Sequence, residues 1–216
     1  MMRYSDLKDL LYNWNGANEF LFHAINDLSG DPLYDSVMVA ISNASDHRLF
    51  PYYMGGLFAL AVLTLLFRLA TGKAGAKGFI FAWFGIFCVL AAGYAVDGKI
   101  IGFMKEQYAY PRPYVVFPAS DMHLLMPLKA EDANRSFPSG HASFATLMVV
   151  GLWPVLSPQL AFAGTLFILA VCWSRIAVGA HFPADVLAGF LLTMVIVLIL
   201  RAIIYIVLRR LFKIRC

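Results

Sequence analysis

Charged residues are scarce in this chain, since Asp, Glu, Lys and Arg make up only 14% of its 216 residues whereas 61% are hydrophobic. The mean hydropathy is +0.72. Soluble domains carry about 25% charged residues, so this composition excludes an ordinary soluble protein. It predicts an integral membrane protein embedded in the lipid bilayer, and we expect no nucleic-acid partner.

Cysteine is also rare. Cys88 and Cys172 lie inside apolar runs, and Cys216 is the last residue. An odd set with no metal-ligand spacing predicts neither a disulfide framework nor a cysteine metal site. Because no repeat, low-complexity tract or linker interrupts the sequence, residues 1–216 are expected to form a single domain.

Apolar runs with few or no charged residues predict the membrane spans, because about 20 helical residues cross the hydrocarbon core with every backbone polar group paired. The runs are 50–68, 78–96, 142–174 and 183–208. The third is too long for one crossing and is interrupted by Pro154 and Pro158, so it predicts a helical hairpin of two spans. Arg201 is near enough to the end of the last run to extend its charge to the membrane surface. The sequence therefore predicts an all-α polytopic membrane bundle of about five transmembrane helices.

Residues 1–47 differ from the rest, because acidic residues interrupt them and apolar residues recur three and four positions apart, as from Phe20 to Leu28. This spacing predicts two or three amphipathic helices lying at the membrane interface. A short additional span near 33–45 is the alternative, but the aspartates around it leave too little uncharged length.

Basic residues predict which side of the membrane each connection faces. The segment from Arg68 to Lys77 and the tail "RRLFKIRC" contain seven bases and no acid, which places both in the cytoplasm. Residues 98–138, an expected active-site loop within a transmembrane core of 48–212, then face the opposite side. We expect a bacterial inner membrane protein with its site toward the periplasm or the outside.

Residues capable of chemistry gather in three segments on that outer side. They are "KEQYAYPRP" at 105–113, "PSGH" at 138–141 and "SRIAVGAHFPAD" at 174–185. Taken singly, they have simple explanations as snorkelling bases, a helix N-cap and a hydrogen-bonded pair one turn apart. Charged groups at membrane depth are costly, so their convergence on one surface favours a functional site.

The cations and helix-start donors of these segments suit a phosphate ester. Lys105, Arg112 and Arg175 can neutralise a phosphate or diphosphate, and the guanidinium groups add bidentate contacts. Ser139 and Gly140, at the start of a helix, supply hydrogen-bond donors and a positive dipole end.

Two histidines complete a catalytic set. His181, oriented by Asp185 one helical turn later, is a candidate nucleophile, and His141 is a candidate general acid and later general base. Two histidines and an aspartate also suit a metal ion. Three nearby cations would repel a divalent ion, however, so we expect no metal and no other cofactor.

Together the segments resemble the three-part signature of the type 2 phosphatidic acid phosphatase superfamily. Its pattern is Lys, six residues, Arg-Pro; then Pro-Ser-Gly-His; then Ser-Arg, five residues, His, three residues, Asp. Every defined position is filled between residues 105 and 185. The resemblance implies a metal-independent phosphatase that forms a phosphohistidine on His181, with the other signature residues in the roles given above. Membrane members commonly have six spans, whereas this sequence predicts five with additional interfacial helices.

An apolar chain with this site at the membrane face suggests a lipid phosphate substrate. Candidates are undecaprenyl pyrophosphate, which we favour, phosphatidate, phosphatidylglycerol phosphate and lipid A phosphate. His123, Lys129 and Arg135 are spare polar residues that could contact a second phosphate and select the head group. A phosphotransferase with a lipid diphosphate donor is an alternative, as is a non-catalytic protein that binds or transports anionic lipids. The oligomeric state stays open.

Overall fold

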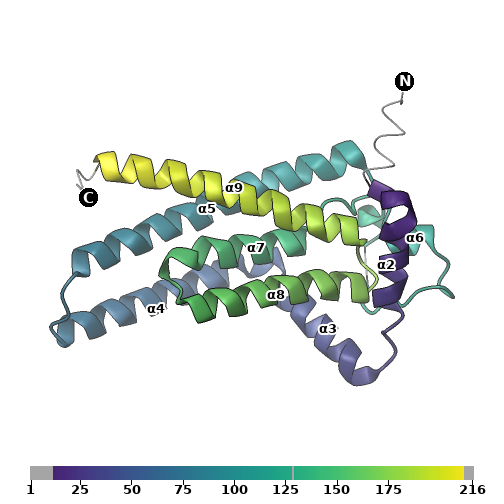
Figure 1. Cartoon of the computed structure of the whole chain (residues 1–216), viewed down its shortest axis with the longest axis horizontal. Helices are drawn as coiled ribbons and strands as arrows, with labels where there is room; N and C mark the ends of the chain where they lie inside the picture. The colour runs from purple at the N-terminus through teal and green to yellow at the C-terminus, as the bar shows by residue number, and fades with distance from the viewer. Residues whose placement is uncertain (1–11, 128, 212–216) are drawn as a thin grey trace.

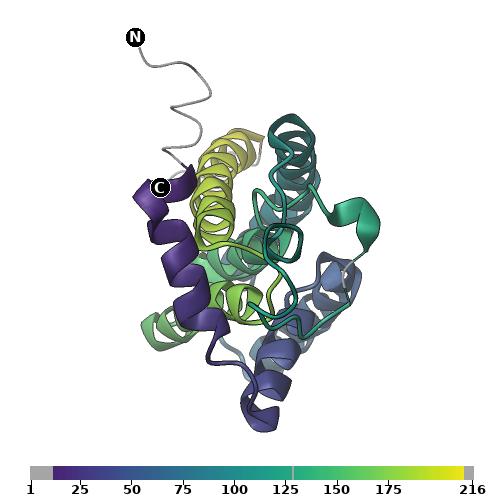
Figure 2. The same ribbon diagram turned by 90° about the vertical axis from the view of Figure 1, so that its right-hand side faces the viewer.

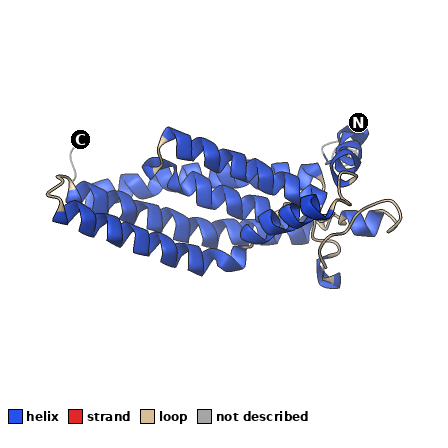
Figure 3. Ribbon diagram, turned by 90° about the horizontal axis from the view of Figure 1, so that it is seen from below, coloured by secondary structure: helices blue, strands red, loops and turns tan. Residues whose placement is uncertain are grey.

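The computed structural model describes residues 12–127 and 129–211 and shows a bundle of roughly parallel and antiparallel helices (Figure 1). No strand occurs in these two ranges (Figure 3). The five core helices are α4 (Phe50–Ala70), α5 (Ala76–Tyr108), α7 (Gly140–Leu152), α8 (Pro158–Ala177) and α9 (Pro183–Leu211). The prediction of an all-α bundle of about five membrane helices is confirmed.

Four helical segments are long and apolar enough to cross a membrane. They are His47–Ala70, Ala76–Val116, Pro158–Ala177 and Pro183–Leu211. The predicted third span is shorter, because α7 has only 13 residues and ends at the 3-10 helix η4 (Trp153–Val155). At 1.5 Å per residue it is about 20 Å long, which is less than the hydrocarbon thickness of about 30 Å. The turn between α7 and α8 accordingly ends short of the tips of α4, α5 and α9 (Figure 1).

A side chain of α9, Arg201, stabilises the end of the short hairpin within the membrane. Its guanidinium donates a hydrogen bond from Nη2 to the carbonyl oxygen of Val150 in the last turn of α7. The last carbonyls of a helix have no partner within the helix, and lipid offers none. The prediction that Arg201 extends toward the membrane surface is therefore wrong, because its charge points inward to this carbonyl.

The second core helix is longer than the sequence predicts. Residues 98–138 are not all loop, since α5 continues to Tyr108, where Ala109 adopts the left-handed conformation with φ 47°. Proline follows at positions 111 and 113 and prevents a further turn. The connection after α5 contains the short helix α6 (Pro113–Val116) and the 3-10 helix η3 (Ala130–Asp132).

Two helices precede the core, as predicted for 1–47. After the 3-10 helix η1 (Trp14–Gly16), α2 (Ala17–Asn26) crosses the ends of α8 and α9 (Figure 2), and α3 (Pro32–Ala44) packs beside α8. The 13 residues of α3 are too few for a span, so the alternative of an additional crossing near 33–45 is not observed. The 3-10 helix η2 (His47–Leu49) then leads into α4.

The face of α2 that packs on the bundle combines the apolar Phe22 with two asparagines. Phe20 is 71% exposed, whereas Asn18, Phe22 and Asn26 are buried. The Asn26 amide donates hydrogen bonds to the carbonyl oxygens of Ala177 and His123, both at 2.8 Å. Asn26 therefore satisfies a carbonyl that the end of α8 leaves open.

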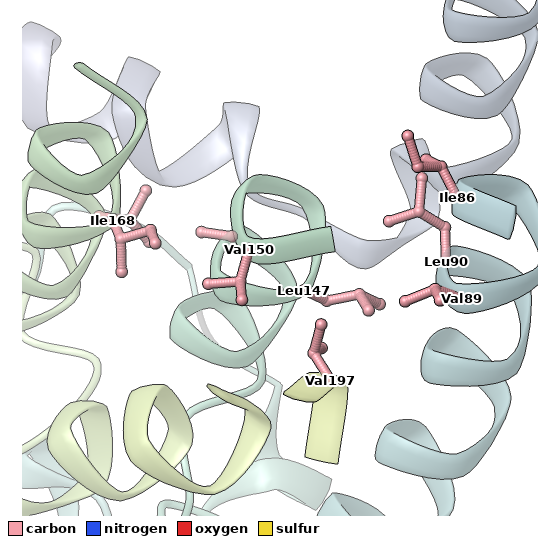
Figure 4. Packing of buried hydrophobic residues seen from close by; sticks show 9 residues of the cluster. Ile86, Val89, Leu90, Leu147, Val150, Ile168 and Val197 are labelled. Carbon is pink, nitrogen blue, oxygen red and sulfur yellow. The ribbon is translucent and has the colours of Figure 1, made fainter. Parts of the chain in front are cut away.

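The core of the bundle lies where α5, α7, α8 and α9 meet (Figure 4). Its buried aliphatic side chains include Ile86, Val89, Leu90, Leu147, Val150, Ile168 and Val197. Gly93 and Gly151 allow close packing there, since a Cβ atom on either would collide with a leucine of the neighbouring helix. Most other large apolar side chains of the long helices point outward, as the lipid environment requires.

Candidate active site

A cavity of about 440 Å³ opens at the end of the bundle where α2 and α6 lie. The three segments singled out in the sequence converge on it. Its lining includes Lys105 and Arg112, Gly140 and His141, and His181. The basic connection between α4 and α5 lies at the opposite end of the bundle (Figure 1).

The centre of the site is the pair formed by His181 and Asp185. The histidine lies in the turn between α8 and α9 and is 1% exposed, and the aspartate in the first turn of α9 is fully buried. Nδ1 of His181 is 3.3 Å from Oδ2 of Asp185. We assign the proton to Nδ1, where the carboxylate can accept it, so that the lone pair of Nε2 faces the cavity side.

The turn that carries His181 depends on Gly179. Its backbone φ is 76°, and a Cβ atom at this position would collide with the carbonyl oxygen of His123. Glycine adopts this left-handed conformation without steric cost. The chain can therefore reverse directly after α8 and place His181 next to the first turn of α9.

Further donors fix the Asp185 carboxylate. Ser136 donates to Oδ2 at 2.5 Å, the backbone N–H of Phe182 donates to the same oxygen at 2.8 Å, and Tyr12 donates to Oδ1 at 2.9 Å. Burial and the neighbouring Asp185 raise the pKa of Tyr12 far above its usual value, so this phenol stays a neutral donor. Sequence reasoning missed Tyr12 and Ser136, and neither carries a spacing signal that would reveal it.

His181 is held in its neutral form. Burial, together with the positive charges of Arg112 and Arg175, lowers its pKa well below the ordinary value of 6.5. Nη1 of Arg112 is 3.3 Å from Nε2 of His181. A guanidinium so close to the free ring nitrogen disfavours a second positive charge there.

Lys105 and Arg112 are anchored by neutral carbonyl groups. Lys105 Nζ donates to the carbonyl oxygen of Arg135 at 2.8 Å. Arg112 Nε and Nη1 donate to the carbonyl oxygens of Asp132 and Ala180, each at 2.9 Å. Carbonyl partners orient the cations without cancelling their charge, so this side of the cavity attracts an anion.

Ser139 and Gly140 begin α7 beside the pair. The backbone N–H of Ser139 donates to the carbonyl oxygen of Asp185 at 2.9 Å, which ties the start of α7 to α9. Gly189 permits this approach, since a Cβ atom there would lie 2.5 Å from the Ser139 carbonyl oxygen. The buried Ser139 hydroxyl has no hydrogen-bond partner among the described residues. It is a polar group in place for a ligand.

Arg175 is placed differently from expectation. It is 3% exposed and is not among the residues that line the cavity. Its Nη1 donates to the hydroxyl of Ser42 in α3 and lies 4.0 Å from Sδ of Met126. In this conformation the guanidinium is directed toward α3, where Ser42 supplies an acceptor that no sequence pattern indicates.

Of the three residues expected to select a head group, the structure brings only Arg135 to the cavity. Lys129 instead forms an exposed ion pair with Glu131 at 3.2 Å. The His123 backbone is bound by Asn26, which accepts its N–H at 2.7 Å.

The cavity is also lined by polar residues that the sequence analysis did not single out. His47 and Arg48 of η2 line the cavity, as does Asp97 of α5. No motif marks these three in the sequence.

No group of three or more His, Cys, Asp or Glu residues suited to a metal ion occurs within residues 12–127 and 129–211. The expectation that catalysis needs no metal therefore stays a prediction.

The fold and the cavity define an integral membrane helical bundle with a buried histidine–aspartate pair in a cationic pocket. Residues 81–209, from α5 to α9, match the model of the PAP2 superfamily. The chain belongs to this superfamily, which confirms the resemblance given by its three segments.

Curated relatives and solved structures agree with this assignment. The lipid A 1-phosphatase of Rhizobium johnstonii is 28% identical over 124 residues, which are 56% of this chain and 48% of the relative. The chain thus spans about half the length of this relative. The undecaprenyl-diphosphatase BcrC of Bacillus subtilis is 28% identical over 189 residues, 83% of this chain and 80% of the relative.

Two crystal structures have a similar fold. Aquifex aeolicus LpxE superposes with a TM-score of 0.62 at 23% identity, covering 85% of this chain and 94% of LpxE. A PAP2-type phosphatidylglycerolphosphate phosphatase of Bacillus subtilis gives 0.59 at 21% identity, covering 88% and 85%.

Proposed function

We propose that the protein is a membrane lipid phosphatase that cleaves a phosphate monoester or diphosphate through a phosphohistidine intermediate. The observation that carries this proposal is the neutral, carboxylate-backed His181 beside Lys105 and Arg112, whose anchoring partners are uncharged. A site that only bound anionic lipid would need the cations but not the oriented imidazole. Membership of the PAP2 superfamily and the names of the relatives support the same activity.

In the first step, Nε2 of His181 attacks phosphorus. The N–P bond forms as the bond from phosphorus to the leaving oxygen breaks, and the electron pair stays on that oxygen. In a monoester this is the ester oxygen of the lipid, and in a diphosphate it is the oxygen that bridges the two phosphorus atoms. His141 donates a proton to it, since the anionic phosphate nearby favours the protonated imidazole. Asp185 stabilises the positive charge that develops on the His181 ring.

In the second step, His141 accepts a proton from water while the water oxygen attacks phosphorus. The N–P bond breaks, inorganic phosphate leaves and His181 is restored. Lys105, Arg112 and the Ser139–Gly140 helix start would hold the phosphoryl oxygens in both steps. Arg175 would join them if its guanidinium turned from Ser42 toward the cavity on substrate binding.

We further propose an isoprenoid diphosphate such as undecaprenyl pyrophosphate as the substrate. The relative that this chain covers over most of its length is named an undecaprenyl-diphosphatase. The positive-inside bias supports a cavity on the outer side of a bacterial inner membrane, because the basic connection after α4 lies at the other end of the bundle.

The deciding experiment measures phosphate release by the detergent-purified protein with EDTA present. The panel is undecaprenyl pyrophosphate, phosphatidate, phosphatidylglycerol phosphate and lipid A. His181→Ala should be inactive, and His23→Ala, which changes a partly exposed histidine of α2 away from the cavity, should match the wild type. Release from no lipid, or an active His181→Ala protein, would reject the proposal. Phosphate passed to a second lipid instead of water would identify a phosphotransferase.

A further inference from the structure

Asp97 is a buried carboxylate that none of the three signature segments contains. It lies in the middle of α5, is 4% exposed and borders the inner part of the cavity. An acidic group at membrane depth is costly unless it is paired and has a specific use. The three-segment signature and the mechanism proposed above leave it unexplained.

Two hydroxyl groups from different helices bind this carboxylate. Ser143 of α7 donates to Oδ2, and Thr193 of α9 donates to Oδ1 at 2.7 Å. Both donors are buried as well, with exposed fractions of 2% and 0%. One side chain of α5 thus joins α5, α7 and α9 at a single point.

The same three helices carry Lys105, His141 and Asp185 near their ends at the cavity. Lys105 follows Asp97 by eight residues on one face of α5, and Asp185 precedes Thr193 by eight residues on one face of α9. Eight residues correspond to about 12 Å along a helix. His141 lies only two residues before Ser143 at the start of α7. The Asp97 junction therefore lies about two turns from Lys105 and from Asp185 along their helices, and about half a turn from His141 along α7.

Hydrogen bonds are directional, so they can fix the relative orientation of the helices, which the neighbouring aliphatic contacts leave free. Apolar residues pack helices together at least as well as a buried polar group, so stability alone is weak grounds for a carboxylate here. The two oxygens of Asp97 accept from two defined directions, which sets the rotation and the height of α7 relative to α5 and α9. A small rotation of α7 would move His141 away from the leaving oxygen.

We propose that Asp97 is a positioning residue that acts through Ser143 to hold His141 at the leaving group. This inference rests on the proposed phosphatase function. It predicts that the effect of changing Asp97 depends on the leaving group, because a general acid accelerates the reaction most when the leaving group is poor. An alkyl phosphate, whose alkoxide needs a proton, should depend on Asp97 far more than an aryl phosphate such as 4-nitrophenyl phosphate.

The test compares first-turnover rate constants for an alkyl phosphate and for 4-nitrophenyl phosphate. Asp97→Ala and Ser143→Ala should each slow the alkyl phosphate at least 30-fold more than the aryl phosphate. Asp97→Asn should recover at least tenfold of that loss, because the amide can accept from one hydroxyl and donate to the other. Thr165→Val is the matched control, since it removes a hydroxyl that bonds only within α8, to the Ala161 carbonyl, and it should change neither rate.

Equal slowing of both substrates by Asp97→Ala and Ser143→Ala would overturn the positioning role and leave a structural one. Unchanged rates would overturn it as well. If Asp97→Ala does not fold, Ser143→Ala decides, because it removes only the α7 half of the junction. A wild-type protein that cleaves neither substrate would reject the phosphatase function itself, which is a different outcome from equal slowing.

Discussion

The phenol of Tyr12 donates a hydrogen bond to Oδ1 of Asp185 across 173 residues of sequence. Tyr12 also stacks on Tyr110, with ring centroids 3.8 Å apart. It lies outside residues 81–209, which the family model covers. The amino-terminal segment therefore completes the support of the His181–Asp185 pair.

Tyr12→Phe should lower kcat by about ten- to a hundredfold, because a hydrogen bond to a charged group contributes roughly 1.5–3 kcal/mol and about 1.4 kcal/mol is a factor of ten. The KM should change little, since Tyr12 is not a cavity-lining residue. Steady-state phosphate release checks both values. Tyr52→Phe, at an exposed tyrosine of α4, is the control. An unchanged kcat would show that Ser136 and the Phe182 backbone are sufficient.

Arg112→Lys should lower kcat/KM at least about 100-fold, the scale of losing one transition-state donor. A lysine cannot reproduce the fork that donates to the carbonyl oxygens of Asp132 and Ala180. The same assay with Arg135→Lys gives the comparison, because Arg135 lies at the cavity edge in loose ion pairs of 3.6 and 3.9 Å. Similar small losses in both variants would contradict a special role for Arg112.

The pH profile should reflect the lowered pKa of His181. The imidazole attacks only when neutral, so the rate falls once the pH drops below its pKa in the folded protein. Since burial and nearby cations put that pKa well below 6.5, kcat/KM should hold as the pH decreases through 6.5 and decline only in more acidic solution. An acid limb centred at or above pH 6.5 would argue against this assignment.

Chelation should leave the activity intact. EDTA removes divalent ions, and the proposed chemistry uses only histidines, a carboxylate and fixed cations. Phosphate release is measured before and after dialysis against EDTA. A loss that magnesium restores would reinstate the metal reading of the two histidines and the aspartate.

Arg201→Gln should destabilise the protein by about 1–3 kcal/mol, because the Val150 carbonyl loses a charged donor in a place without water. Thermal unfolding in detergent measures the change, and turnover per folded molecule should stay the same. Arg209→Gln alters an exposed arginine two turns later and should leave the unfolding temperature nearly unchanged. Equal shifts for the two variants would mean that the bond to Val150 contributes nothing.

The long helices could be predicted because long apolar runs with few charged residues can be recognised directly in the sequence. The position at which α5 ends could not be predicted in this way. Asp97 looked like the membrane boundary, yet its charge is satisfied by hydroxyls 46 and 96 residues away, and the helix continues past it. The prediction for Arg201 was wrong for the same reason, since its acceptor, the carbonyl oxygen of Val150, is 51 residues earlier.

The signature segments predicted a group of residues that gathers at the cavity, Arg175 excepted, but not the other side chains around them. His181 and Asp185 are separated by one helical turn in the sequence, so their contact could be predicted. Ser42, whose hydroxyl holds Arg175, comes from a helix outside those segments. His47 and Arg48 reach the cavity only because η2 turns the chain there. Such contacts depend on tertiary packing that no local pattern encodes.

The bond between Arg201 and Val150 also bears on the order in which the protein is assembled. During synthesis the hairpin of α7 and α8 emerges before Arg201, so the end of α7 then has no partner in lipid. In the orientation proposed above, the hairpin should stay near the cytoplasmic surface until α9 inserts and draws it to its final depth. In a Ser157→Cys chain that ends at residue 200, a water-soluble maleimide should label this turn from the cytoplasm. The full-length chain that carries Ser157→Cys together with Cys216→Ser, which removes the carboxy-terminal cysteine, should resist labelling at residue 157. Equal labelling of both chains at residue 157 would refute this sequence of events.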